Sequence, residues 1–445
     1  MSQPSNEPVV DRPPVNADLT PAPAGAELTR QTRIGGFKIS ADTLRAYSLL
    51  FALVFIWVFF HYITAPSSPS FREWEGLGGF FFMLKNHVVY FFSFGWVQEG
   101  IFLSPRNFSN LMRQTAVTGV LAVGMLMIIV TGNIDLSIGS LVGFIGGVAA
   151  IAQGTANGWG LVPTLAAAII VGVAVSQAQG ALVAYANIPA FIVTLGGLLA
   201  WRGVVLGMTR GETIPITQSG FKAIGQQFVT RPVGLGLAFL AVAGIVYLNV
   251  RRHRARERYG LGKTSVSNLA LGIVLPALVV VLFVLRMNAY EGMPIPVIIL
   301  IVVALGGAFL MQNTTFGRYL YAIGGNPDAA RLSGINVRTH IWAVFCIMGA
   351  LAGVASLIYT ARVGSASPDA GNLLELDAIA ACVIGGTSLM GGRGTVFGAC
   401  LGALFMASLD NGMSLLNVQP YSQYIIKGAI LVTAVGLDML GRKQG

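Results

Sequence analysis

Residues 114 to 201 constrain this chain more than any other stretch, because Asp135 is the only formally charged side chain among them. A soluble domain carries charges on about a quarter of its residues. A helix that crosses a hydrocarbon core about 30 Å thick needs roughly 20 apolar residues, so the stretch has room for roughly three or four crossings. The whole chain follows the same trend, with 54% hydrophobic and 10% charged residues. We therefore predict an all-α polytopic membrane protein.

Apolar runs long enough for membrane helices recur along most of the chain. We expect about ten to twelve transmembrane helices in two related halves, with some helices short or broken. The 56 glycines support close helix packing, because membrane helices approach one another through small residues. The runs lie near residues 46–64, 115–131, 136–153, 161–186, 189–209, 233–250, 269–286, 294–313, 341–361, 376–390, 395–409 and 421–440.

The basic residues predict the topology. The net charge is +10, but the Lys and Arg residues gather in short clusters beside apolar runs, as the positive-inside rule expects, and they do not indicate nucleic acid. The densest cluster is Arg251 to Arg258, and we place it and the N-terminus in the cytoplasm. The predicted parts are a disordered, proline-rich cytoplasmic tail (1–45), a transmembrane permease domain (46–440) with a basic cytoplasmic loop (251–268) and a cytoplasmic coupling loop (314–340), and a C-terminal tail (441–445).

Segment 79–95 is apolar and aromatic, but Lys85, Asn86 and His87 lie at its centre. A charge at membrane depth is costly. Counting the segment as a span would also move the Arg251 cluster to the outside. We therefore predict an interfacial or re-entrant excursion.

Two glycine-rich segments interrupt the apolar sequence. The first is TGNIDLSIGSLVG (131–143) and the second is IGGTSLMGGRGTVFG (384–398). Irregular backbone at membrane depth is tolerated only where protein or a water-filled cavity covers it, and paired interruptions in two halves point to a transport route. With the polar island SLDNGMS, they supply the candidate residues of a translocation path: Asn133, Asp135, Ser137, Ser140, Thr387, Ser388, Asp410 and Asn411.

The two acidic candidates each have a second interpretation. Asp135 lines or gates the path, or it caps the helix that starts at Leu136, since Asp is common at helix N-termini. Asp410 and Asn411 offer the donors and acceptors that sugar hydroxyls need. Alternatively, they belong to an interfacial turn closed by Gly412, which we favour slightly.

Residues 315–340 form the longest polar stretch of the second half. Gly324 to Pro327 predict a turn, and a short helix is expected from Asp328 to Leu332, ending at Ser333 and Gly334. Such an element is suited to docking a partner, although a plain loop is the alternative.

No catalytic, metal or nucleotide motif is present in the sequence. The three cysteines and four histidines are scattered, without zinc-site spacing. Gly262, Lys263 and Thr264 look like the end of a phosphate-binding loop, but Glu257 stands where that loop needs its first glycine. We expect no metal and no ATP on this chain, and an enzyme is disfavoured.

Several motifs together resemble the permease subunits of monosaccharide ABC importers of the xylose and ribose type, and most of all the xylose permeases. They are GNIDLSIGS, IPAFIVTLGGLLAWRG, FGRYLYAIGGNPDAARLSGI, LDAIAACVIGGTSLMGG and SLDNGMS, and the resemblance extends over about residues 100 to 440. It implies an inner-membrane homodimer, a periplasmic sugar-binding protein, and cytoplasmic ATP-binding cassette subunits that carry ATP and Mg²⁺. The coupling residues that it implies are Arg318, Gly324, Gly325, Asn326, Ala329, Ala330, Arg331 and Gly334.

Two other transport functions stay open at this point. One is a proton-coupled secondary transporter acting through Asp135, although a proton relay usually needs more than one titratable group. The other is an ABC permease for a different solute, such as ribose, arabinose or a branched-chain amino acid. An amino-acid carboxylate would favour helix N-termini or an arginine in the path, and Arg202 and Arg393 are the candidate arginines.

Overall fold

The computed structural model describes residues 32–34, 37–39, 41–67, 85–91, 93–154, 158–259 and 266–443. The chain divides into two units, residues 1–45 and residues 46–445. In the first unit, strand β1 (Thr32–Ile34) pairs antiparallel with strand β2 (Phe37–Ile39). Most of the tail lies outside the described residues, so its disorder stays a prediction.

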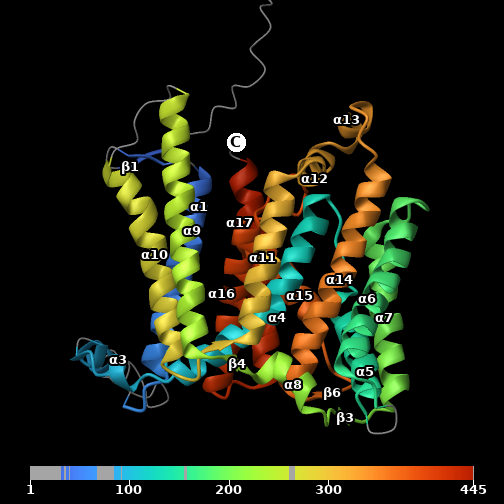
Figure 1. The fold of residues 1–445 in the computed structure, drawn as a ribbon, viewed down its shortest axis with the longest axis horizontal. Coiled ribbons are helices and arrows are strands. Elements are labelled where there is room, and N and C mark those ends of the chain that lie inside the picture. Colours follow the sequence, from blue (N-terminus) through green and yellow to red (C-terminus); the bar gives the residue numbers. More distant parts are fainter. Residues whose placement is uncertain are drawn as a thin grey trace, which may run out of the picture. The chain divides into compact units, whose positions relative to one another are not determined.

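Helices make up most of the second unit (Figure 1). In chain order they are α1 (Ala41–Ile63), α3 (Trp96–Glu99), α4 (Pro105–Val130), α5 (Ile138–Ala152), α6 (Leu161–Ala184), α7 (Ala190–Thr209), α8 (Ser219–Gln226), α9 (Arg231–Arg258), α10 (Val266–Asn288), α11 (Ile295–Asn313), α12 (Thr315–Gly325), α13 (Pro327–Leu332), α14 (Val337–Val363), α15 (Leu374–Ile384), α16 (Val396–Leu415) and α17 (Pro420–Lys443).

Each of the twelve apolar runs overlaps a helix, although the run 376–390 continues beyond the end of α15 at Ile384. Among the described residues, seven helices are long and apolar enough to cross a membrane: α4, α6, α7, α9, α11, α14 and α16. Shorter apolar stretches occur in α1 (Leu49–Ile63), in α5, and in α10 (Gly272–Asn288). The expected all-α membrane fold with some short helices is confirmed.

Three segment predictions need correction. The basic segment 251–268 is not simply a loop, because Arg251 to Arg258 form the last turns of α9 and α10 begins at Val266. The coupling loop 314–340 is largely helical, since it contains α12, α13 and the start of α14. The predicted C-terminal tail 441–445 is helical as far as Lys443. In the first and third segments the polar residues extend a helix beyond its apolar part, whereas α12 and α13 are separate short helices.

Segment 79–95 is described from residue 85 onward, except residue 92. Residues 85–91 are helical, and the Tyr62 hydroxyl of α1 lies 2.7 Å from Nδ1 of His87. The aromatic rings of Tyr62 and Trp96 also pack edge to face. This part of the segment is therefore attached to the end of α1. Residues 79–84 lie outside the described part, so the re-entrant path stays a prediction.

Helix α4 forms the centre of the second unit. It is buried at every position from Leu111 to Val130 except Arg113 and Gln114, and it packs against α11, α14, α15 and α16. A helix that is apolar on all sides lies either in a protein core or in lipid, and the burial of α4 places it in the core. The helix thus fixes the positions of both glycine-rich segments, which follow α4 and α15.

Small residues bring α6 and α14 into close contact. Gly172 of α6 faces Gly349 of α14, and a Cβ atom on either one would overlap the carbonyl oxygen of the other. A Cβ on Gly180 would lie 2.6 Å from Cβ of Phe345. This is the packing through small residues that membrane helices use, and it explains part of the high glycine content.

Two short antiparallel pairs join the connections at one end of the bundle. Strand β3 (Ile214–Pro215) pairs with β6 (Ser365–Ala366), and β4 (Phe228–Val229) pairs with β5 (Met293–Pro294). Figure 1 shows them at the lower end, whereas α13 and the arginine-rich end of α9 lie at the upper end. The two basic regions therefore share one end, as the charge pattern predicts.

Candidate functional site

The two glycine-rich segments lie in mirrored settings. The long helix α4 precedes the first segment and the short helix α5 belongs to its end, whereas the short helix α15 precedes the second and the long helix α16 follows it. The segments also meet. The Gly392 backbone N–H donates to the carbonyl of Val130, the last residue of α4, at 2.9 Å, and a Cβ atom on Gly391 would lie 3.0 Å from the nitrogen of Gly132 in the first segment. The predicted pair of interruptions is therefore one contiguous region inside the bundle.

Asp135 is fully buried in the first segment and organises the start of α5. Its Oδ1 accepts hydrogen bonds from the backbone N–H of Ser137 at 2.8 Å and from the Ser137 hydroxyl at 2.7 Å. This is an Asx turn, which satisfies a backbone donor that a helix start leaves unpaired. The Ser137 hydroxyl also lies 3.1 Å from Oε1 of Gln179 on α6. Helix α5 begins at Ile138 with Ser137 as its N-cap, so Asp135 supports the turn that precedes the helix. Its capping and its transport interpretations both stay predictions.

Most of the other polar residues of the two segments are buried, and the hydroxyls of Ser140 and Thr387 have no hydrogen-bond partner among the described residues. Asn133 donates to Oγ1 of Thr131 at 3.0 Å, and the backbone N–H of Thr387 donates to the Cys382 carbonyl at 2.9 Å. Ser140 has no exposed surface, and Ser388 has 3%. In this conformation Ser140, Thr387 and Ser388 are closed to a solute, whereas Asn133 is half-buried, so a role of the three buried residues in a path requires the segments to rearrange.

The polar island SLDNGMS lies within α16 and is not the interfacial turn that we favoured. The amides of Asn411 and Asn107 on α4 bond reciprocally, at 2.7 and 3.2 Å. A Cβ atom on Gly412 would overlap the ring of Phe60, so this glycine permits a close helix contact and does not close a turn. The Trp57 indole N–H donates to Ser408 at 2.9 Å. The island therefore connects α16 to α1 and α4.

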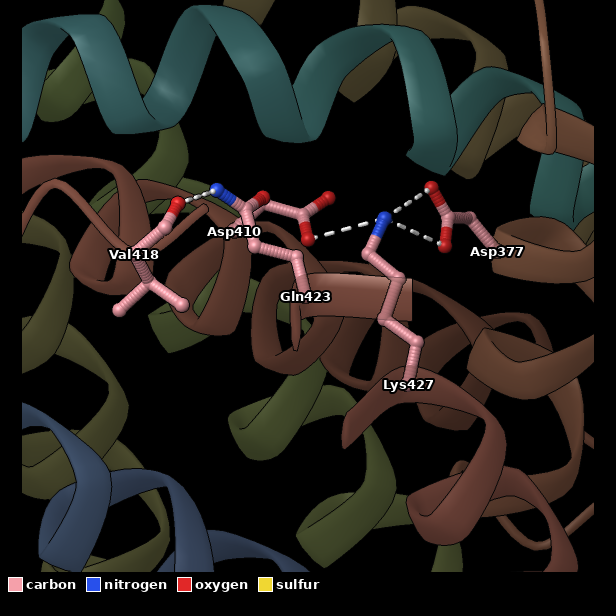
Figure 2. Close-up of polar contacts among 5 residues, drawn as sticks. All are labelled: Asp377, Asp410, Val418, Gln423 and Lys427. Atoms are coloured by element: carbon pink, nitrogen blue, oxygen red, sulfur yellow. Dashed lines mark hydrogen bonds and ion pairs between the residues drawn. The ribbon is translucent and has the colours of Figure 1, made fainter. Parts of the chain in front are cut away.

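Asp410 belongs to an ion cluster that joins three helices (Figure 2). Nζ of Lys427 on α17 lies 3.0 and 3.1 Å from the two carboxylate oxygens of Asp377 on α15, and 2.9 Å from Oδ1 of Asp410 on α16. The side chains of Asp377, Lys427 and Asp410 are 8%, 18% and 31% exposed. Nearby, Gln423 donates to the Val418 carbonyl at 2.8 Å, which holds the turn into α17.

Sequence reasoning missed Asp377 and Lys427. The available signal was that each is a charged residue inside an apolar run, since such residues in membrane helices usually pair with one another. The eight path candidates do not converge on one point. Asp135 and Ser137 contact each other and α6, whereas Asp410 and Asn411 contact α17 and α4.

The coupling candidates lie on α12 and α13. The short helix expected after the turn is confirmed as α13, where the Asn326 side chain accepts hydrogen bonds from the backbone N–H groups of Asp328 and Ala329 at 3.0 Å each. The coupling candidates differ in how far they are exposed to a partner. Ala330 is buried, and Gly324 is half-buried against the rest of the bundle. The exposed ones are Arg318, Gly325, Asn326, Ala329, Arg331 and Gly334.

Leu332 was not among the candidates, although it is 89% exposed at the end of α13. Together with Arg331, it gives this end of the bundle an exposed apolar and basic tip. We call α12 and α13 the docking element.

Comparison with known proteins decides the family. Residues 107–435 match the family described as branched-chain amino acid transport system, permease component. The chain belongs to this permease family. The matched range contains both glycine-rich segments, the ion cluster and the docking element. The chain is thus a transport subunit rather than an enzyme.

Several relatives of this permease are known by their substrates. The xylose transport system permease protein XylH of Escherichia coli K12 is 44% identical over 383 residues, which are 86% of this chain and 97% of that protein. XylH of Haemophilus influenzae is 45% identical over 366 residues, or 82% and 97%. The ribose import permease protein RbsC of E. coli K12 is 35% identical over 337 residues, or 76% and 87%. No solved structure matches the chain.

Proposed function

We propose that this permease translocates a monosaccharide, D-xylose in preference to others, across the inner membrane as the membrane subunit of an ATP-driven importer. A periplasmic binding protein delivers the sugar. Two copies of the permease enclose the path, and separate ATP-binding cassette subunits hydrolyse ATP with Mg²⁺. The N-terminus and the docking element face the cytoplasm.

One observation carries the proposal. The permeases named for xylose are 44% and 45% identical to this chain over nearly their whole length, whereas the one named for ribose is 35% identical. The difference favours xylose over ribose. It applies to the whole subunit and not to one motif, because the matches extend over 97% and 87% of those proteins respectively.

The docking element supports the ATP-driven mechanism. Arg331 and Leu332 project from α13, so a cassette subunit that binds this tip can move α12 and α13 together. A partner changes a two-state equilibrium only through different affinities for the two states. The cassettes therefore drive transport if their ATP-bound form binds the docking element of one pore state more tightly. The binding protein then supplies most of the sugar selectivity.

The two rival functions lose support. The proton-coupled rival loses support because the chain belongs to the permease family and is 44% identical to a permease named for xylose transport. The contacts of Asp135 do not decide between the functions, since its Oδ2 has no hydrogen-bond partner in the part of the chain that the structure describes. Arg202 donates to the carbonyls of Pro368 and Ala370 at 3.1 Å each, so its guanidinium holds a loop in place and does not await an amino-acid carboxylate.

The test is uptake of labelled xylose, ribose and arabinose by proteoliposomes that contain this permease, its cassette subunit and its binding protein, with and without ATP. The variant Arg331→Glu reverses the charge of the docking tip. Arg258→Glu makes the same change on α9, at the same end of the bundle but outside the docking element, and is the matched control.

ATP-dependent xylose uptake that Arg331→Glu abolishes and Arg258→Glu retains is the expected result. Uptake that needs no ATP and collapses with an uncoupler would establish the proton-linked rival instead. ATP-dependent uptake of ribose or arabinose without xylose would keep the importer and refute the substrate.

A further inference from the structure

The docking element contacts the end of α4 and the second glycine-rich segment directly, and the second segment in turn contacts the start of the first. Three parts of the chain meet at this point: residues 130–132, which are the end of α4 and the start of the first segment, Gly324 near the end of α12, and Gly391–Gly392 in the second segment. We call them the glycine junction. The Gly392 N–H donates to the Val130 carbonyl at 2.9 Å, so α4 and the second segment are joined there.

Gly324 fits into this junction only because it lacks a side chain. A Cβ atom on Gly324 would overlap the Val130 carbonyl oxygen and would lie 2.6 Å from the Gly392 nitrogen. A Cβ on Gly391 would lie 2.8 Å from the Gly324 carbonyl oxygen and 3.0 Å from the Gly132 nitrogen. Three backbones are therefore packed against one another with no flexible side chain between them.

Tyr321 makes a second connection, one turn earlier on α12. Its hydroxyl donates to the Gly394 carbonyl at 2.8 Å. Residues 317, 320 and 323 form the buried face of α12, so this helix lies flat against the bundle. Helix α13 follows α12 directly, with the Asn326 cap between them. A displacement of α13 thus reaches the junction through a short and rigid path.

We propose that the glycine junction transmits the movement of the docking element to both glycine-rich segments, with Gly324 and Tyr321 as positioning residues. This rests on the proposed function, because the movement is driven by the cassette subunit. Backbone packed on backbone cannot absorb a displacement by changing rotamers. The two segments therefore move with α12, and they rearrange together.

The test measures sugar transported per ATP hydrolysed, in the proteoliposomes described above. Gly324→Ala adds a methyl group where the Val130 carbonyl oxygen lies. The control is Gly306→Ala on α11, where a Cβ atom would meet nothing within 4 Å. We expect Gly324→Ala to lower the transport-to-hydrolysis ratio at least about fivefold, which is the low end of what overpacking costs, and Gly306→Ala to leave it unchanged.

Tyr321→Phe keeps the ring and removes only the hydroxyl, so this variant tests the proposal if Gly324→Ala fails to assemble. Loss of one hydrogen bond is expected to lower the transport-to-hydrolysis ratio by about threefold to tenfold relative to the unmodified permease. A loss of folded protein alone lowers uptake and hydrolysis in proportion and leaves the ratio intact, so the ratio separates coupling from stability.

The outcomes separate failure of this proposal from failure of the proposed function. A ratio that is unchanged in assembled Gly324→Ala, or equally lowered in Gly306→Ala, overturns the proposal, and so does an unchanged ratio in Tyr321→Phe when Gly324→Ala does not assemble. If the unmodified permease shows no ATP-dependent sugar uptake, the proposed function fails, and that result is visible before any variant is compared.

Discussion

Replacing Lys427 with methionine is expected to destabilise the bundle more than removing either of its carboxylate partners. In the ionised cluster, two carboxylates and one ammonium carry a net charge of −1. Lys427→Met leaves Asp377 and Asp410 facing each other without a counterion. Breaking a buried ion pair by removing one partner costs about 3–5 kcal/mol, and we expect a loss of free energy of unfolding in that range.

The two carboxylates differ in geometry, so their losses are expected to differ. Asp410→Asn leaves a neutral pair in which both oxygens of Asp377 contact Lys427, and Asp410 is 31% exposed. We expect a cost of about 1 kcal/mol or less. Asp377 is only 8% exposed and makes the two-oxygen contact, so Asp377→Asn is expected to cost about 2 kcal/mol.

The assay is SDS-induced unfolding in detergent micelles, followed by tryptophan fluorescence. The control is the triple variant with Asp377→Asn, Lys427→Met and Asp410→Asn, which removes every charge and so avoids an unpaired one. Uncharged replacement of a buried ion cluster is often close to neutral. The reasoning is refuted if Lys427→Met unfolds like the unmodified protein, or if the triple variant is as unstable as Lys427→Met.

Three further predictions concern other contacts. Gly349→Ala is expected to destabilise the permease by about 1–3 kcal/mol because the facing backbone of α6 leaves no space. The control Gly244→Ala is expected to leave stability unchanged, because a Cβ atom there would meet nothing within 4 Å. SDS unfolding compares the two variants. Asn107→Ala leaves the Asn411 amide unpaired and is expected to cost about 1–3 kcal/mol, and a double-mutant cycle showing additive losses would contradict the reciprocal bond. Burial raises the pKa of Tyr321 above its ordinary value of about 10. The difference in stability between the unmodified protein and Tyr321→Phe is therefore expected to be constant below about pH 10 and to shrink at higher pH, because the unfolded chain ionises there first. Unfolding measured at several pH values tests this.

The helices could be predicted because their signals are local. A membrane helix satisfies its backbone hydrogen bonds within itself, so most of the expected apolar runs coincide with helices, and the run 376–390 departs from one where the glycine-rich segment begins. The short helix α13 was predictable from Asn326 and Pro327 at its start and Gly334 after its end, which are the usual start and stop residues. Even the turn residues kept their expected roles there, since Gly334 adopts a positive φ of 83°.

The site was less predictable because its contacts join distant residues. Lys427 pairs with Asp377, 50 residues earlier in the chain, and nothing local indicates that pairing. Gly412 was interpreted as a turn residue, whereas its small size accommodates the Phe60 ring on another helix. A glycine alone does not reveal whether its backbone freedom or its lack of a side chain matters. For the same reason the glycine junction was invisible before the structure.

The ion cluster also has a consequence for how the protein is made. Asp377 and Asp410 are synthesised before Lys427, and at about 5–20 residues per second the first waits roughly 3–10 s for its counterion. During that interval the carboxylate of α15 has no lysine to neutralise it, which disfavours stable burial in lipid. Arrival of α17 then completes the cluster. A nascent chain stopped before Lys427 is therefore expected to remain at the insertion machinery and to be degraded, whereas one extended past it is released into the membrane.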